Sequence, residues 1–124
     1  MAKILIVDDE IEFCDLLGLR LERAGQHEVI KAYEGESAVQ LAQTSKPDLI
    51  ILDIAMPKMS GFEVIEALDK IEPTKNIPII ILTASTSKET TEKIFSTRVK
   101  GCVVKPFNPP ELMKKIGLAL GGKA

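Results

Sequence analysis

Five short apolar segments recur along the chain, and longer segments with helical spacing lie between them. The apolar segments are residues 4–7 ("ILIV"), 29–32 ("VIKA"), 49–52 ("LIIL"), 79–82 ("IIIL") and 102–104 ("CVV"). They are rich in isoleucine and valine and do not alternate with polar residues, which is typical of strands buried on both faces. A parallel sheet with helices on either side provides such burial, so the pattern predicts an α/β domain.

The intervening segments carry apolar residues at helical spacing. They are the stripe of Phe13, Leu17, Leu21 and Ala24, the less apolar segment 37–42, the group Phe62, Ile65 and Leu68, and the series Leu112, Ile116 and Leu120. Gly25 is expected to end the first helix, and Pro109 and Pro110 to begin the last. A helix over 90–95 is also expected, although two threonines and few apolar residues weaken its pattern.

The composition limits the size and the partners of the domain. With 124 residues, 45% hydrophobic and 27% charged, the chain is expected to form one domain over 1–124, with a core over about 3–120 and a frayed tail at 121–124. A formal charge of −2 with scattered basic residues argues against nucleic acid as a partner. The first apolar run is too short for a signal peptide or a membrane span, so we expect a cytoplasmic protein. Cys14 and Cys102 lie among apolar neighbours and are expected to be buried thiols.

Polar side chains follow four of the predicted strands. Asp8 and Asp9 follow the first, Asp53 the third, Thr83 the fourth and Lys105 the fifth. Right-handed crossovers bring the carboxyl ends of parallel strands to one edge, where doubly wound sheets bind ligands. Three carboxylates within about 4 Å would repel by roughly 4 kcal/mol per pair at an effective dielectric of about 20, so the cluster requires a cation. Lys105 alone cannot neutralise it.

A divalent ion fits this set of side chains. Carboxylates, one backbone carbonyl and several waters suit the octahedral, partly hydrated coordination of Mg²⁺ better than the crowded oxygen cage of Ca²⁺. Zinc is not favoured, because His27 is the only histidine and is expected in a polar turn.

The loop after Asp53 favours chemistry over a purely structural metal. In "DIAMPKMSGFE", Pro57 and Gly61 punctuate a tight loop that leaves the carboxylate exposed to a reactant. Carboxylates are nucleophiles for phosphoryl transfer, which requires positioning and charge neutralisation. Lys105 and Thr83 suit the contacts with the remaining phosphoryl oxygens, and Pro106 would fix the turn that aims Lys105.

Each of these residues also has a simpler interpretation. Asp8, Asp9 and Asp53 are suited to capping helices or loops, Thr83 to a turn, and Lys105 to a solvated surface. Their shared position at one edge of the sheet favours a functional site. The apolar stripe of the first helix and the run 56–59 are instead assigned to packing and loop structure.

Four segments together resemble a known family. "VDDE", "DIAMPKMSG", "ILTAS" and "VVKPF" are similar, in order and spacing over about residues 3–120, to the signature segments of the receiver domain of two-component response regulators, in particular single-domain, chemotaxis-regulator-like members. The resemblance implies a flavodoxin-like, doubly wound sheet of five parallel strands in the order 2-1-3-4-5, with helices on both faces.

The resemblance also implies a role for each matching residue. Asp53 corresponds to the phosphoacceptor. Asp9 directly, and Asp8 largely through water, would hold Mg²⁺, or Mn²⁺ in its place. The backbone carbonyl of Ala55 would complete this set of ligands. Thr83 corresponds to the switch hydroxyl, and Lys105 to the lysine that contacts the phosphoryl group. Ala55 and Ser85 are expected to influence the lifetime of the aspartyl phosphate.

The implied function is a signalling switch rather than an enzyme with a separate substrate. The phosphoryl group would come from a phosphohistidine of a sensor kinase or phosphotransfer protein, and a downstream protein would bind the last two helices and last strand, near 90–98, 102–104 and 110–120. One residue departs from the family, since Cys102 stands where receivers often carry tyrosine or phenylalanine. We therefore expect the signal to depend on Thr83 and the loop after it.

Two other functions remain open from the sequence. An aspartate-nucleophile phosphohydrolase would use the same acids, threonine, lysine and Mg²⁺, but it usually needs a second acid where Ala55 stands, and a cap for which the chain has no room. A pseudo-receiver would bind partners without phosphorylation, which the complete set of acids, Thr83 and Lys105 opposes.

Overall fold

The computed structural model of the chain describes residues 2–25, 27–54, 56, 58–83, 99–104 and 109–121. Strands and helices within this part follow one another as β1 (Lys3–Val7), α1 (Ile11–Gly25), β2 (Glu28–Ala32), α2 (Gly35–Ser45), β3 (Leu49–Asp53), α3 (Gly61–Asp69), β4 (Ile79–Thr83), β5 (Val99–Val104) and α5 (Pro109–Ala119). The expected helix over 90–95 and all but the first residue of the expected tail lie outside the described residues. Among the helices described, none has the length and hydrophobicity needed to cross a membrane.

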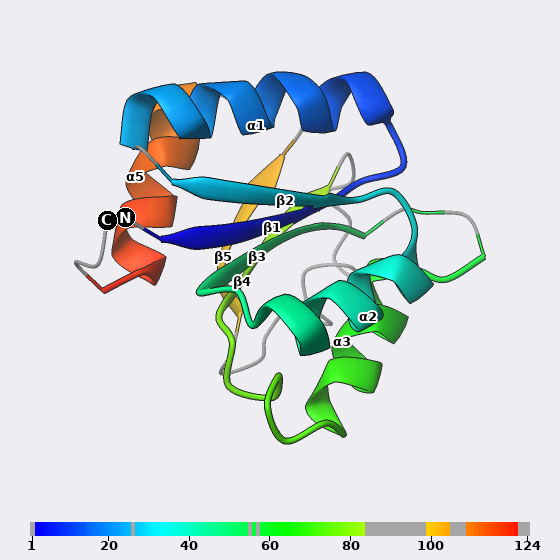
Figure 1. Cartoon of the computed structure of the whole chain (residues 1–124). Helices are drawn as coiled ribbons and strands as arrows, with labels where there is room; N and C mark the ends of the chain where they lie inside the picture. Colours follow the sequence, from blue (N-terminus) through cyan, green and yellow to red (C-terminus); the bar gives the residue numbers. More distant parts are fainter. Residues whose placement is uncertain are drawn as a thin grey trace.

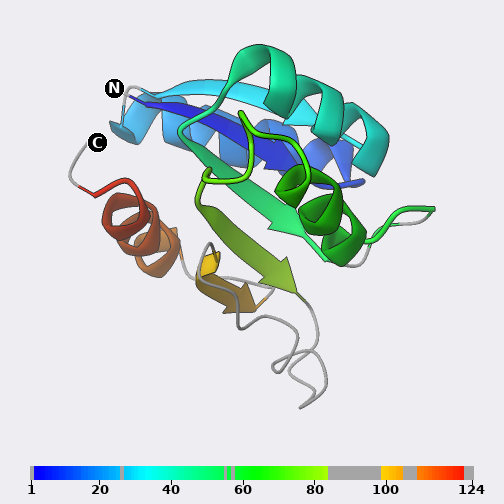
Figure 2. The ribbon, with the colours of Figure 1, turned by 90° about the horizontal axis from the view of Figure 1, so that it is seen from below.

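The five strands form one parallel sheet in the order β2-β1-β3-β4-β5. Helices α1 and α5 cover one face of the sheet, and α2 and α3 cover the other (Figures 1 and 2). The predicted flavodoxin-like, doubly wound α/β fold with the order 2-1-3-4-5 is therefore confirmed.

Alternate residues of the strands build two separate hydrophobic clusters. Ile4 and Ile6 of β1 point toward the cluster that includes α1 and α5, whereas Leu5 and Val7 belong to the cluster with α2 and α3. The same alternation continues in β3 and β4, in which every residue is buried. The central strands are therefore apolar at every position for the predicted reason: helices cover both of their faces.

The prediction of burial on both faces is wrong for the edge strands. In β2, Glu28 is exposed and only Ala32 is fully buried, and in β5 Val104 is 42% exposed. Each of these strands has a single neighbour in the sheet, so one side of its backbone and part of each face remain outside the core. β5 also begins at Val99, earlier than its apolar run, with an irregularity in its pairing opposite Ile79 and Ile80.

Helix α1 confirms the predicted stripe for Phe13, Leu17 and Leu21, whereas the side chain of Ala24 lies outside the described part of the structure. Cys14, Leu17 and Leu21 are buried and Phe13 packs against the same cluster. Helix α3 differs from its prediction, because Val64 and Leu68 are its buried apolar residues whereas Phe62 and Ile65 are only partly covered.

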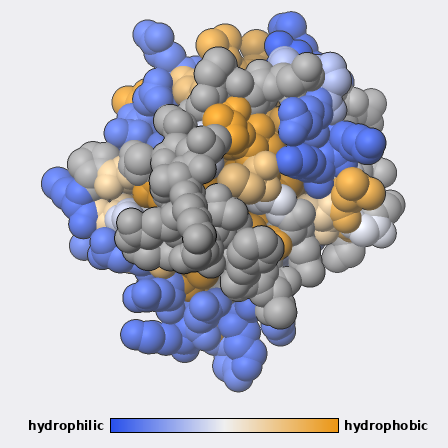
Figure 3. Space-filling view, turned by 180° about the vertical axis from the view of Figure 1, so that it is seen from behind, coloured by the Kyte–Doolittle hydropathy of each residue, from blue (hydrophilic) through white to orange (hydrophobic). Residues whose placement is uncertain are grey.

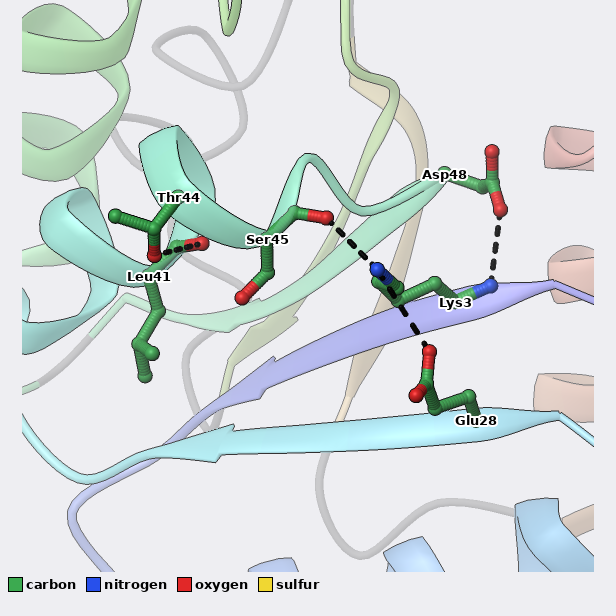
Figure 4. A network of polar contacts seen from close by, with 6 residues as sticks. All are labelled: Lys3, Glu28, Leu41, Thr44, Ser45 and Asp48. Atoms are coloured by element: carbon green, nitrogen blue, oxygen red, sulfur yellow. Dashed lines mark hydrogen bonds and ion pairs between the residues drawn. The ribbon is translucent and has the colours of Figure 1, made fainter.

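A network of hydrogen bonds and an ion pair joins β1 to neighbouring segments at the amino-terminal edge of the sheet (Figure 4). The backbone N–H of Lys3 donates to Asp48 Oδ2 at 2.9 Å, and the N–H of Asp48 donates to the carbonyl of Lys3 at 2.7 Å. The Lys3 ammonium donates to the carbonyl of Ser45 at 3.1 Å and lies 3.7 Å from the Glu28 carboxylate. A cation at the end of α2 also complements the negative end of the helix dipole.

His27 is buried rather than placed in a polar turn as the sequence suggested. It is 7% exposed at the start of β2, where Nδ1 accepts the backbone N–H of Ala2 at 3.2 Å. This hydrogen bond requires a free electron pair on Nδ1 and therefore a neutral ring. Burial lowers the pKa of His27 below its ordinary value, because desolvation disfavours the imidazolium.

The turn from β3 into α3 is fixed by two local features. Ser60 and Glu63 form a capping box, in which Ser60 Oγ accepts the N–H of Glu63 at 3.3 Å and Glu63 Oε1 accepts the N–H of Ser60 at 3.4 Å. The N–H of Gly61 donates to the carbonyl of Ile54 at 2.8 Å. A Cβ atom at Gly61 would lie 2.7 Å from both the Asp53 carbonyl oxygen and the Ile54 Cα. Only glycine allows the two backbones to approach this closely.

Replacing His27 should change how stability depends on pH. In the unfolded chain His27 titrates near its ordinary value of about 6.5, and in the fold it titrates lower, so its contribution is complete above about pH 6.5 and is lost as the pH falls through the lowered pKa. We expect the free energy of unfolding in urea to fall between pH 7 and about pH 5.5, and to fall less in His27→Gln, whose amide oxygen still accepts the Ala2 N–H. Equal pH slopes for both proteins would contradict this role.

Gly61→Ala should destabilise the domain by about 1–3 kcal/mol, because the new methyl group meets backbone atoms that cannot move independently. Gly117→Ala is the matched control, since a Cβ atom there meets nothing within 4 Å and alanine favours the helix by about 0.5–1 kcal/mol. Urea unfolding of the three proteins measures both effects. Equal stabilities of Gly61→Ala and the parent would show that the turn tolerates a side chain.

Candidate functional site

Three aspartates meet at the carboxyl end of the central strands. Asp8 and Asp9 directly follow β1, and Asp53 is the last residue of β3. Val7 pairs with Leu52 in the sheet, so Asp8 and Asp53 occupy the next positions of two neighbouring strands. One carboxylate oxygen from each of the three residues lies within 4.8 Å of those of the other two. The structure thus brings together the three predicted acids.

The surroundings of the three carboxylates differ. Asp8 is fully buried and Asp53 is 5% exposed, whereas Asp9 is exposed. Asp8 Oδ1 accepts the backbone N–H of Glu10 at 2.9 Å, and the backbone N–H of Asp8 donates to the carbonyl of Ala32 at 3.1 Å. The Cys14 thiol of α1 donates to the Asp8 carbonyl at 3.4 Å. Asp8 is therefore held at both its backbone and its side chain. The expectation of an exposed Asp53 carboxylate is wrong, because Asp53 is still part of the buried strand β3, and Asp9 is the acid that solvent reaches.

Thr83 lies at the same edge of the sheet. It is the last residue of β4, is 3% exposed, and pairs with Val104, the last residue of β5. The neighbouring pair in the sheet is Asp53 with Leu82, which places Thr83 one step beyond Asp53 on the adjacent strand. The backbone N–H of Ile54 also donates to the Leu82 carbonyl at 3.1 Å, so the two strand ends are joined directly.

Several predicted site residues lie outside the described part of the chain. They are Ala55, Ser85, Lys105 and Pro106. The described chain reaches Val104, immediately before Lys105, and Val104 pairs with Thr83. The contacts of Lys105 remain a prediction, as do the roles of the other three residues.

The three carboxylates offer a ligand set for a hard divalent cation. All three donors are oxygen atoms, and the separations of up to 4.8 Å are near the span of about 4 Å across an octahedron with metal–oxygen distances of about 2.1 Å. Nothing in the cluster favours a soft metal, because the donor atoms are neither thiolate nor imidazole. The residues therefore fit Mg²⁺, and the exposed Asp9 leaves one side of the cluster open to water and a reactant.

Cys102 is half-buried, which differs from the expectation of full burial, whereas Cys14 is fully buried as predicted. Desolvation raises the pKa of the Cys102 thiol, while the charge of Lys115 acts in the opposite direction. The Lys115 ammonium donates to the Cys102 carbonyl at 2.8 Å. The thiol is therefore protonated at neutral pH and serves as a small packing group of β5.

Two features that support the site were not predicted from the sequence. The capping box of Ser60 and Glu63 has a readable signature, a serine followed three residues later by glutamate ahead of an apolar helix. The close approach of Gly61 to Asp53 has no such signature, because it depends on how α3 is laid against the end of β3.

Comparisons with known proteins agree with this geometry. The sequence profile of the response regulator receiver domain matches residues 4–117. Protein PilH of Pseudomonas aeruginosa is 39% identical over 124 residues, which cover 98% of this chain and 100% of PilH. The structure of the Vibrio cholerae chemotaxis protein CheY4 superposes with a TM-score of 0.88 at 39% identity, covering 96% of this chain and 98% of that one.

Longer relatives match over part of their length. The alkaline phosphatase synthesis transcriptional regulatory protein PhoP of Bacillus subtilis is 40% identical over 92% of this chain, which spans 46% of PhoP. Receiver domains act in phosphorylation-dependent signalling and interact with histidine kinases and downstream effectors. The matched profile, the sheet order and the cluster of three aspartates lead to one conclusion: this chain belongs to the response regulator receiver domain family.

Proposed function

We propose that this chain is a phosphorylation-dependent signalling switch whose phosphoryl acceptor is Asp53. The observation that carries the proposal is the gathering of the Asp8, Asp9 and Asp53 carboxylates within 4.8 Å at the carboxyl end of the sheet. Asp53 is the one that ends a strand and leads into the rigid turn of Ser60 and Gly61. Asp53 also stands at the position that corresponds to the phosphoacceptor of receiver domains.

In the proposed reaction Asp53 is the nucleophile. One of its carboxylate oxygens bonds to phosphorus while the bond between phosphorus and a histidine nitrogen of the donor protein breaks. The side chain thereby exchanges its carboxylate charge for a phosphoryl group carrying about −1.5 to −2 charges. The acceptor itself changes covalently, so the chain is proposed to be a substrate of a kinase or phosphotransfer protein rather than an enzyme with a substrate of its own.

Asp8, Asp9 and Asp53 are proposed to hold Mg²⁺, or Mn²⁺ in its place, together with the backbone carbonyl of Ala55. When bound, the ion offsets the mutual repulsion of the carboxylates and the charge of the phosphoryl oxygens. The hydrogen bond from the Glu10 N–H to Asp8 Oδ1 supports this assignment, because it orients the buried carboxylate before any ion arrives. The exposed Asp9 is proposed as the direct ligand, and Asp8 as the one that acts largely through water.

Thr83 and Lys105 are proposed to contact the remaining phosphoryl oxygens. Thr83 ends the strand next to Asp53, within the same edge. Lys105 directly follows Val104, the residue that pairs with Thr83, and Pro106 is proposed to set the turn that aims its ammonium group. Ala55 and Ser85 are proposed to influence the lifetime of the aspartyl phosphate through their small size.

The output is proposed to reach partners through Thr83 and the loop that follows it. Cys102 is half-buried on β5 and is too small to alternate between an inward and an outward position as an aromatic ring would. The proposed partner surface comprises 90–98, 102–104 and 110–120, where Val104 and Leu118 are exposed apolar residues. A cytoplasmic location is proposed because histidine kinases present their phosphoryl groups there.

A small acyl phosphate and Mg²⁺ should add one phosphoryl group to each chain, on Asp53. Intact-mass measurement should show a single adduct, and Asp53→Asn should show none, because an amide is not a nucleophile for phosphorus at neutral pH. Rapid release of phosphate over many cycles would instead indicate a phosphohydrolase. An adduct that persists in Asp53→Asn would place the acceptor elsewhere.

Asp9→Asn should weaken Mg²⁺ binding by about tenfold or more, because it removes one of the charges that attract the ion. A titration with Mg²⁺ followed by backbone amide shifts in NMR spectra measures the affinity. Asp48→Asn is the matched control, since Asp48 lies at the opposite edge of the sheet and its amide oxygen still accepts the Lys3 N–H. Equal Mg²⁺ affinities for the parent and Asp9→Asn would remove Asp9 from the ligand set.

A further inference from the structure

The outer face of α1 carries exposed leucines, although the helix already has a buried apolar inner face. Cys14, Leu17 and Leu21 face the core, whereas Leu16 is 70% and Leu19 is 45% exposed. Seen from behind, hydrophobic atoms reach the upper edge of the molecule, where α1 runs, with hydrophilic side chains on either side (Figure 3). Two exposed leucines close together on one helix face are typical of a surface that packs against another helix.

A groove adjoins these leucines. It has a volume of about 650 Å³ and is lined by Phe13, Leu16, Leu17 and Leu19 of α1, by the arginines of the same helix, and by Pro109 at the start of α5. Its walls are mostly apolar carbon, so it suits an aliphatic side chain from another molecule. The occupant can be inferred from the charges that surround it.

The charges of the outer face are arranged symmetrically about its leucines. Glu12, Leu16, Leu19 and Arg23 follow one another by four, three and four residues, which places all four on one stripe of the helix. With a rise of about 1.5 Å per residue, Glu12 and Arg23 lie about 8 Å on either side of the midpoint between the leucines. No ion pair joins Glu12 or Arg23 to another residue in the described part of the chain.

We propose that the outer face of α1 binds the same face of a second copy of this chain, with the two helices antiparallel. A two-fold axis through the midpoint brings Glu12 of each copy beside Arg23 of the other, and joins the four leucines into one apolar contact. The charges of the two copies are complementary, because Glu12 and Arg23 lie at equal distances from the midpoint between Leu16 and Leu19 in each copy. A random partner helix would have to match this spacing independently.

The proposed interface is small. A single pair of four-turn helices offers less than the roughly 800 Å² per partner that stable complexes bury, so the dimer should form only at high protein concentration. The association requires neither Mg²⁺ nor phosphorylation, because Leu16 and Leu19 lie on the side of α1 opposite the buried residues that contact the sheet and Asp8. None of the three carboxylates of the proposed site takes part in the association.

Sedimentation equilibrium at up to about 1 mM protein tests the proposal. The parent chain should associate to a dimer, and Leu16→Glu should be monomeric at the same concentrations. Leu118→Glu on α5 is the matched control, because Leu118 is 73% exposed but lies in the proposed partner surface and not on the outer face of α1. This variant should dimerise like the parent. A monomeric parent would overturn the proposal and leave the groove to a helix of another protein, such as a phosphohistidine donor.

Charge reversal distinguishes this antiparallel arrangement from any other. Glu12→Arg and Arg23→Glu should each weaken association by about tenfold or more, since each reversal creates two like-charge contacts in the dimer. A mixture of the two variants should dimerise about as strongly as the parent, because both contacts are then attractive again. Unchanged dimerisation of the single variants, or failure of the mixture to associate, would contradict the pairing of Glu12 with Arg23.

Discussion

The parallel register of β1 on β3 is the constraint on which the site depends. Val7 lies opposite Leu52, and the chain therefore places Asp8 and Asp53 side by side as both strands leave the core. In an antiparallel pair these residues would lie at opposite ends of the sheet. The hydrophobic burial of β1 and β3 thus provides the free energy that holds like charges together, and the proposed affinity for a cation rests on these charges.

The amino-terminal and carboxyl-terminal edges of the sheet differ in how their charged groups are arranged. At the amino-terminal edge, Lys3 meets Glu28, the carbonyl of Ser45 and, through its backbone, Asp48, so opposite charges and hydrogen bonds complete each other. At the carboxyl edge, three acids gather beside the buried Thr83. The amino-terminal edge pairs opposite charges, whereas the carboxyl edge holds like charges close together, and this is the edge at which we propose that Mg²⁺ and the phosphoryl group bind.

Helix α1 takes part in both the proposed site and the proposed association, through different faces. Its inner face contacts the sheet, and Cys14 donates to the Asp8 carbonyl. Its outer face carries Leu16 and Leu19, which nothing in the described part of the chain covers. The two stripes of the helix point in opposite directions, so a substitution on the outer stripe does not remove the hydrogen bond from Cys14 to Asp8.

The sequence by itself determined the α/β class, the central strands, the apolar stripes of α1 and α5, and the position of the three acids at the ends of strands. Apolar periodicity and the residues at strand ends are local properties that can be read without the fold. The burial of His27, the exposure of β2 and the contact of Gly61 with Asp53 were not predicted from the sequence. These features depend on which segments become neighbours. The strand order, and with it the identity of the edge strands, came from a resemblance. Only the tertiary structure decided how far those edge strands are exposed, because burial depends on which helices pack over each strand.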